Sequence, residues 1–331
     1  MRNLIDKFGR KINYLRISIT DRCNLRCVYC MPFEAIQKIS RNDILSYEEF
    51  LRIAEIAVKK GISKIRITGG EPLVRKGVTD FIHSLSGIAG IQDISLTTNG
   101  VSLKDFASGL FGAGLRRINV SIDSLNYRKF QEITGGGSLK EVWKGIKEAM
   151  EVGLLPIKIN TVVIRGVNDD EVIDFAKLSI DNPYHIRFIE FMPVGSTSAW
   201  SEDKHVSFRE IKEKIEGFGK LSPIHTNRDD GAGPAQMFRI DGAMGEIGFI
   251  SPLSNHFCSS CNRLRLTADG KLRTCLLSDR EVDLMPVLRG NPVDSELERL
   301  IESAILNKPE KHHFGEEIFK KCSRDMSAIG G

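Results

Sequence analysis

Six of the seven cysteines fall into two groups of three, and their spacing suits metal chemistry. The first group is C-x3-C-x2-C and the second is C-x2-C-x13-C, made by Cys23, Cys27 and Cys30 and by Cys258, Cys261 and Cys275. An odd number of cysteines in a chain without an export signal argues against a disulfide framework. The cysteines therefore predict two metal sites with three ligands each, and Cys322 receives no role.

The first group lies in a polar segment, flanked by Arg22, Asn24 and Arg26, which argues against three buried structural cysteines. Three thiolates this close can hold three corners of an iron–sulfur cube and leave the fourth iron open to a ligand. Zinc is the alternative, but no histidine lies nearby and Asp21 is the only adjacent carboxylate. The spacing favours a cluster with one open iron.

The second group leaves two kinds of site open. A zinc ribbon or a Cys3His site that uses His256 is one, and a second iron–sulfur cluster with an open iron is the other. Arg263 and Arg265 follow on one face of a short predicted strand. Two guanidiniums beside a metal site favour a phosphorylated ligand, although a solvated strand face would show the same alternation.

Short β-branched segments recur along the chain, and each precedes a helical pattern. They span 14–20, 64–68, 93–97, 117–122, 157–164 and 185–191. Ser46 with Glu49, Ser138 with Glu141, and Ser207 with Glu210 mark helix starts. Strand and helix in alternation, six times, predict parallel strands joined by right-handed crossovers.

The two faces of these strands differ in polarity. Apolar side chains alternate with polar ones in most of the segments, as in Leu15-Arg16-Ile17-Ser18. A doubly wound sheet is covered on both faces and would be apolar on both, so we expect a partly closed (β/α)6 barrel with a polar lumen. Arg16, Arg66 and Lys158 would face that lumen, where buried positive charge favours an anion such as a polyphosphate. No G-x4-G-K-[ST] motif occurs, so a P-loop is excluded.

Composition and charge limit the class of protein. The chain has 331 residues, 41% apolar and 27% charged, with a net charge of +4, as expected for a folded globular protein. This charge is too small to indicate nucleic-acid binding, and no uncharged stretch is long enough for a membrane helix. Charged residues from Arg2 to Lys11 interrupt the position of a signal peptide, so we expect a cytoplasmic protein.

The length exceeds what one core usually spans, so a second region is expected. Segment 227–235 is rich in Asp, Gly and Pro and breaks the alternation of strand and helix. We therefore predict a core barrel over residues 1–228 and a smaller region over 229–331 that carries the second cysteine group.

Gly69-Gly70-Glu71-Pro72 ends the second strand, at the barrel rim that also carries the first cysteine loop. Paired glycines allow close approach to a ligand, and Glu71 could accept a hydrogen bond from an ammonium group. C-x3-C-x2-C with Tyr29 before the last cysteine, followed by this G-G-E-P segment, resembles the radical S-adenosylmethionine (SAM) superfamily.

That resemblance implies a radical SAM barrel in which an iron–sulfur cluster at Cys23, Cys27 and Cys30 binds the methionine part of SAM. Cleavage of SAM would then give a 5′-deoxyadenosyl radical. By position, the resemblance implies that Tyr29 contacts the adenine end, Gly70 the methionine part, Ser121 the sugar or carboxylate region, and Met192 the adenine.

Over essentially its full length the chain resembles the GTP 3′,8-cyclase family of molybdenum-cofactor biosynthesis. The resemblance lies in segments 14–21, 96–100, 119–125, 187–190, 245–248 and 257–265, and in the terminal Gly330-Gly331. It implies GTP binding by Arg16, Arg66, Thr97, Lys158, Arg263, Leu264 and Arg265, with catalytic roles for Arg16, Arg263 and Arg265.

The family also implies a second [4Fe–4S] cluster at Cys258, Cys261 and Cys275, whose open iron meets the guanine base. Hydrogen abstraction from the ribose 3′ carbon and addition to carbon 8 would give (8S)-3′,8-cyclo-7,8-dihydroguanosine 5′-triphosphate. Expected partners are a low-potential electron donor and the next enzyme of the pathway, cyclic pyranopterin monophosphate synthase. The resemblance allows a homodimer and implies neither nucleic acid nor membrane.

Three features stay outside these assignments. Composition predicts frayed terminal glycines, whereas the resemblance implies that the tail reaches the active site. We expect His312 and His313 at the surface.

Two other classes of protein remain as alternatives: a peptide- or enzyme-modifying radical SAM protein with an auxiliary cluster, and a zinc-bearing interaction protein.

Overall fold

One large sheet carries the fold. A computed structural model describes residues 4–31, 38–195, 199–224, 233–290, 293–317 and 319–330. Twelve strands within these ranges form a single sheet in the order β12-β11-β10-β1-β2-β3-β4-β5-β6-β9-β8-β7. They are β1 (Tyr14–Ser18), β2 (Lys64–Thr68), β3 (Asp93–Thr98), β4 (Arg117–Ser121), β5 (Ile157–Val163), β6 (His185–Glu190), β7 (Leu221–Pro223), β8 (Gln236–Ile240), β9 (Glu246–Ile250), β10 (Arg263–Leu266), β11 (Lys271–Arg273) and β12 (Glu281–Asp283).

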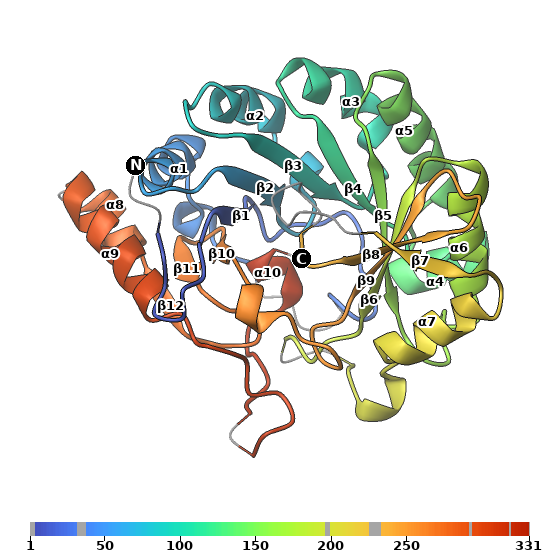
Figure 1. Cartoon of the computed structure of the whole chain (residues 1–331). Helices are drawn as coiled ribbons and strands as arrows, with labels where there is room; N and C mark the ends of the chain where they lie inside the picture. The colour runs from blue at the N-terminus through green and yellow to red at the C-terminus, as the bar shows by residue number, and fades with distance from the viewer. Residues whose placement is uncertain are drawn as a thin grey trace.

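The central part of the sheet is parallel, from β10 through β1–β6 to β9. Antiparallel strands flank it at both ends, β11 and β12 beside β10, and β8 and β7 beside β9. Figure 1 shows the sheet curving without closing, with helices on its convex side. The predicted partial barrel is confirmed. The sequence predicted β1–β6, and the structure adds one parallel strand from the C-terminal third at each end.

The helices cover the convex side of the curved sheet in Figure 1, except for α10, which lies on the concave side. They are α1 (Tyr47–Lys59), α2 (Val78–Ser86), α3 (Leu103–Gly112), α4 (Tyr127–Thr134), α5 (Leu139–Glu151), α6 (Val172–Asp181), α7 (Phe208–Glu216), α8 (Met285–Arg289), α9 (Asp294–Leu306) and α10 (Met326–Ile329). The predicted starts of α1 and α7 are confirmed as capping boxes, and Ser138 accepts from the Glu141 amide at the start of α5.

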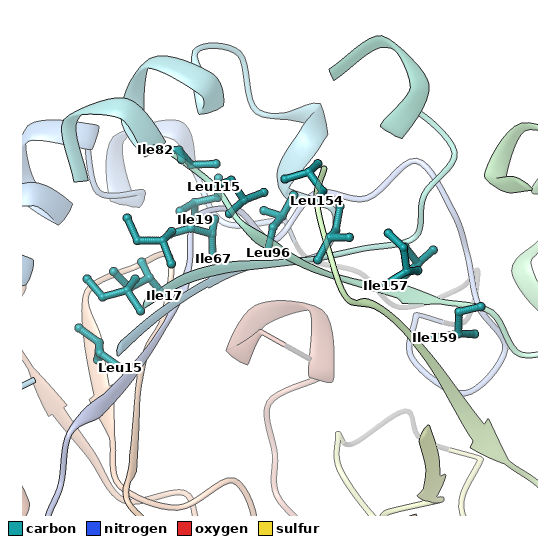
Figure 2. Close-up of a cluster of buried hydrophobic side chains, with 14 of the residues drawn as sticks. Leu15, Ile17, Ile19, Ile67, Ile82, Leu96, Leu115, Leu154, Ile157 and Ile159 are labelled. Atoms are coloured by element: carbon teal, nitrogen blue, oxygen red, sulfur yellow. The ribbon is translucent and has the colours of Figure 1, made fainter. Parts of the chain in front are cut away.

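The hydrophobic core lies between the sheet and the outer helices. Figure 2 shows Ile17, Ile67 and Leu96 pointing from neighbouring strands toward this layer, and all three are fully buried. Each buried side chain of this size contributes about 1.5–3 kcal/mol of transfer free energy. Because side chains alternate along a strand, the polar residues between them face the concave side. The core thus fixes which residues line the interior.

Among the described residues, no helix combines the length and apolar character that a membrane crossing requires. The predicted boundary between residues 228 and 229 falls in segment 225–232, which lies outside the described residues, as does Gly331.

Candidate active site

The first cysteine loop follows β1 and is held by backbone hydrogen bonds. The Arg26 amide donates to the Thr134 carbonyl at 2.8 Å, and the Val28 amide donates to the Ile133 carbonyl at 2.9 Å. Within the loop, the Cys27 carbonyl accepts from the amides of Cys30 and Met31. The end of α4 therefore fixes the loop that carries the three thiols. Burial raises the pKa of Cys23 and Cys27, and raises that of Cys30 to about 12.

The Gly69-Gly70 segment packs directly on the residues before the first cysteine. The Gly70 amide donates to the Thr20 carbonyl at 2.7 Å, and the Glu71 amide donates to the Arg22 carbonyl at 2.8 Å. A Cβ atom on Gly70 would lie 2.5 Å from the Arg22 carbonyl oxygen, so only glycine fits there. The segment forms a narrow cradle beside the cysteine loop.

Glu71 is buried and bound by the protein rather than open to a ligand. Its carboxylate accepts from the Leu73 amide at 3.0 Å, the Thr98 hydroxyl at 2.8 Å and the Asn99 amide at 2.7 Å. Burial raises its pKa to about 7. Glu71 is not among the residues that line the cavity, and its role as an acceptor for a ligand ammonium stays a prediction. The residue joins the segments that follow β2 and β3, because its carboxylate accepts hydrogen bonds from the backbone amides of Leu73 and Asn99.

Tyr29 and Asp123 form a buried pair at the far side of the same loop. The Tyr29 hydroxyl donates to Asp123 Oδ2 at 2.7 Å, and Asp123 Oδ1 accepts from the Val162 amide at 2.9 Å. Burial, followed by the charge of Asp123, raises the pKa of Tyr29, and burial raises that of Asp123 to about 6. The pair orients the Tyr29 ring against β4 and β5.

The second cysteine group lies beside β10 and β11. Cys258 and Cys261 flank a single 3₁₀ turn, and Cys275 follows β11. The Arg263 guanidinium lies 3.8 Å from Cys261 Sγ and stacks over the Phe257 ring at 4.6 Å. Burial alone would raise the pKa of Cys261, but the charges of Arg263 and Lys308 outweigh it and lower the pKa to about 6. This thiol is set to ionise, as a metal ligand must.

A row of arginines crosses three neighbouring strands. Arg265, Arg16 and Arg66 are aligned in register on β10, β1 and β2. Burial, and then the charges of Arg265 and Arg66, lower the pKa of Arg16 well below its usual value. Burial lowers the pKa of Arg265, and also that of Arg187 on β6, to about 9. Such crowded cations bind a polyanion strongly because it relieves their mutual repulsion.

The C-terminal tail reaches both ends of this arrangement. The Gly330 carbonyl accepts from Arg265 at 2.5 Å, and a Cβ atom on Gly330 would lie 2.6 Å from the Thr68 side chain. At the other end of α10, the Ser327 amide hydrogen-bonds Cys30. Arg324 anchors the tail through a bidentate contact with Asp269 at 2.8 and 3.0 Å. Figure 1 shows α10 on the concave side of the sheet.

These features line one cavity. Its wall includes all six grouped cysteines, the arginines of the row and Arg187, and the residues Tyr29, Gly70, Thr97, Ser121, Met192 and Arg263. The two sulfur triads therefore share one interior space with a concentration of positive charge. Each group offers three free thiols on this wall, the donor type that iron–sulfur clusters take, although no group of three side chains among the described residues is placed to hold a metal ion.

Comparison with known proteins gives two matching family models. Residues 17–179 match the radical SAM superfamily, and residues 184–314 match molybdenum cofactor synthesis C. A protein of Alkaliphilus metalliredigens named GTP 3′,8-cyclase is 52% identical over 98% of this chain and 99% of its own length. A GTP 3′,8-cyclase of Thermodesulfovibrio yellowstonii is 53% identical, again over 98% of this chain and 99% of its own.

The chain belongs to the GTP 3′,8-cyclase family. Among solved structures, Streptococcus suis SuiB bound to S-adenosylmethionine has a TM-score of 0.60 and 15% identity, covering 97% of this chain and 79% of that one. At this identity the likeness concerns the fold, which is that of radical SAM proteins.

Most residues that the family resemblance singled out lie on the cavity wall, and two do not. Lys158 is 4% exposed and is not among the lining residues, and the charges of Arg187 and Arg66 act on it. Leu264 is 1% exposed and belongs to the hydrophobic core, so only its backbone can serve a ligand. The roles of all these residues in binding SAM or GTP stay predictions.

Other cavity residues received no role from the sequence. Arg187, Asp123, Asn99 and His312 all line the cavity. The first three lie in segments that carry the family resemblance, but the resemblance did not single out these residues. The predicted surface position is wrong for His312, whose ring is half-buried and contacts the Pro252 carbonyl at 2.7 Å. No local sequence pattern predicts this position of His312, because it depends on a contact with Pro252, 60 residues away in the sequence. His313 is half-exposed beside Glu316.

Proposed function

We propose that the chain converts GTP to its 3′,8-cyclised product with SAM and two iron–sulfur clusters bound in this single cavity. The family makes it a radical SAM enzyme that catalyses a cyclisation. The observation that carries the proposal is the shared cavity, whose wall includes both cysteine triads and the arginine row. A binding protein with one structural zinc would need neither the second triad in the cavity nor the row.

At the first end, Cys23, Cys27 and Cys30 would hold one cluster, and Tyr29, Gly70, Ser121 and Met192 would surround SAM. Gly70 allows its segment to pack against the backbone of Asp21 and Arg22, just before the cysteine loop, and Asp123 keeps Tyr29 in position. When bound and reduced, the cluster and SAM supply a 5′-deoxyadenosyl radical that removes hydrogen from the ribose 3′ carbon.

At the second end, Cys258, Cys261 and Cys275 would hold the other cluster, close to the guanine base. Arg16, Arg66, Arg265 and Arg187, all on the cavity wall, would bind the triphosphate together with the buried Lys158, and Thr97 lies on the same wall. Arg263 lines the cavity 3.8 Å from Cys261 Sγ, where it would contact substrate and thiolate together. Holding the ribose against the radical source is the main task of these residues, because orientation can lower a barrier by several kcal/mol.

The test is whether SAM cleavage depends on GTP. Protein reconstituted with iron and sulfide without oxygen, and given SAM, GTP and a strong reductant, should release 5′-deoxyadenosine and consume GTP in equal amounts. ATP at the same concentration is the matched control and should support little release. Release that is independent of GTP would remove GTP as the substrate and leave only radical SAM chemistry.

Lys158 predicts a pH dependence of nucleotide binding. Burial, with the charges of Arg187 and Arg66, lowers the pKa of Lys158 to about 6, so its amine is mostly neutral at pH 7.5. A triphosphate nearby would raise this pKa, and GTP binding should therefore take up close to one proton at Lys158, with affinity that rises as the pH falls toward 6. Below that pH the amine is already charged and the uptake disappears.

Calorimetric titration of GTP at pH 7.5, in buffers of different ionisation enthalpy, measures this proton uptake. The comparison is between the wild-type chain and Lys158→Met, because the γ-phosphate contributes equally to both. A difference of about 0.5–1 proton is expected from the pKa shift. Equal uptake by the two proteins would show that Lys158 does not change its charge on binding.

The two-part organisation is also a proposal, with a barrel over 1–228 and a C-terminal region over 229–331 that supplies the second cluster. The Mob_synth_C match from residue 184 crosses that boundary, and strands β9 and β10 extend the barrel sheet itself. A low-potential electron donor and the next enzyme of the pathway remain the proposed partners.

A further inference from the structure

Lys308, which follows α9, is a buried cation beside the second cysteine group. The residue is 4% exposed. Its ammonium donates to the Arg263 carbonyl at 3.1 Å and to the Thr274 carbonyl. Arg263 lies two residues after Cys261, and Thr274 directly precedes Cys275. One ammonium thus links the two segments that carry these cysteines.

The charge of this ammonium is balanced differently from that of its neighbour Arg10. Arg10 also binds this region, through the Cys258 carbonyl at 2.8 Å, but its guanidinium forms an ion pair with Asp6 at 2.5 Å. The two acceptors that the described residues offer Lys308 are neutral carbonyls. Burying a charge is costly unless an opposite charge lies near. Carbonyl dipoles orient the ammonium but leave its positive charge uncompensated.

The second cysteine group lies beside this ammonium, because its two acceptor carbonyls belong to residues next to or two positions from Cys275 and Cys261. A cluster held by three thiolates carries net negative charge, which increases by one on reduction, and nearby charge shifts the potential of such clusters. The positive charge of Lys308 and the negative charge of a cluster would therefore offset each other's burial.

We propose that Lys308 is the buried counter-ion of the second cluster: a positioning residue that ties the Cys261 and Cys275 segments together and stabilises the reduced state. The proposal rests on the second cluster of the proposed function. It goes beyond that function because it assigns a role to a residue outside the cavity wall, which touches neither substrate nor SAM.

The test needs a chain in which only the second cluster can form. Full-length protein with Cys23→Ser, Cys27→Ser and Cys30→Ser is the parent, and Lys308→Met removes the charge at nearly constant volume. Lys311→Met is the matched control, because Lys311 lies three residues away but is half-exposed and paired with Glu316 at 2.8 Å. Iron and sulfide per chain, and the midpoint potential followed by electron paramagnetic resonance, are measured for each.

Lys308→Met should lower the ratio of reduced to oxidised cluster at a fixed potential about tenfold, which for one electron is about 59 mV toward a more negative midpoint. Lys311→Met should change this ratio less than about twofold, because solvent and Glu316 screen its charge. An unchanged midpoint in Lys308→Met with full iron content overturns the proposal.

Two further outcomes are distinguishable. If Lys308→Met binds no iron, Lys308→Arg decides: recovery of iron supports a role for the charge, and an equally iron-free arginine variant overturns it. If the parent itself binds zinc or no metal, the second cluster of the proposed function fails, and the Lys308 proposal fails with it for that separate reason.

Discussion

Replacing Cys23 with serine should abolish SAM cleavage, with 5′-deoxyadenosine release reduced at least about a thousandfold. A three-cysteine site has no spare ligand, and a serine hydroxyl does not replace a thiolate on iron. Cys23 also has a defined place in the loop, because its sulfur accepts from the Leu25 amide at 3.3 Å. Release of 5′-deoxyadenosine, measured by chromatography after anaerobic reconstitution, gives the result.

Cys322→Ser is the matched control for this prediction. Cys322 is a free, buried cysteine whose sulfur accepts from Arg273 at 3.0 Å, and serine can accept the same hydrogen bond. Cleavage should stay within about threefold of the wild type. If Cys23→Ser retained cleavage, or if Cys322→Ser lost it equally, the first cysteine group would not be the site of SAM chemistry.

Arg265→Ala should weaken GTP binding by about 30- to 1,000-fold. Arg265 lies at the meeting point of the arginine row and the tail, in register with Arg16 and bonded to the Gly330 carbonyl. Loss of one buried charge-assisted contact to a phosphate costs about 2–4 kcal/mol, which corresponds to this range. Calorimetric titration of GTP measures it, and Arg265→Lys should recover part of the loss because the charge returns without the planar geometry.

The stability of the ligand-free protein separates this effect from misfolding. The charge of Arg265 lowers the pKa of Arg16, so removing Arg265 relieves electrostatic repulsion in the ligand-free site. Arg265→Ala should therefore keep its thermal midpoint without GTP while losing the rise that GTP causes in the wild type. Arg299→Ala, an exposed arginine on α9, should leave both unchanged. Tight GTP binding by Arg265→Ala would contradict the assigned phosphate site.

The strands of the barrel and the first cysteine loop could be predicted because their signals are local. Alternation in Leu15-Arg16-Ile17 specifies which face packs in the hydrophobic core, and such alternation of side chains is a property of any strand. The spacing of Cys23, Cys27 and Cys30 likewise suffices to predict a shared site. These elements form in the structure within one or two residues of their predicted ends.

The pairing of β10 with β1 could not be predicted, although it builds the arginine row. About 250 residues separate Arg16 from Arg265, and nothing local in either strand specifies its neighbour. Likewise, no pattern in the tail indicates that Gly330 contacts Arg265 or that His312 returns to the cavity. Lys158 shows the limit of the face argument: it is buried on β5, yet it is not among the residues that line the cavity. Depth depends on sheet curvature, which alternation does not encode.

The central claim is that both cysteine triads serve one cavity, so that SAM and GTP react within it. Transfer of deuterium from GTP labelled at the ribose 3′ carbon into 5′-deoxyadenosine, followed by mass spectrometry, tests this most directly. The account predicts one deuterium in the methyl group of nearly every 5′-deoxyadenosine released. Unlabelled 5′-deoxyadenosine, formed while GTP is consumed, would contradict it.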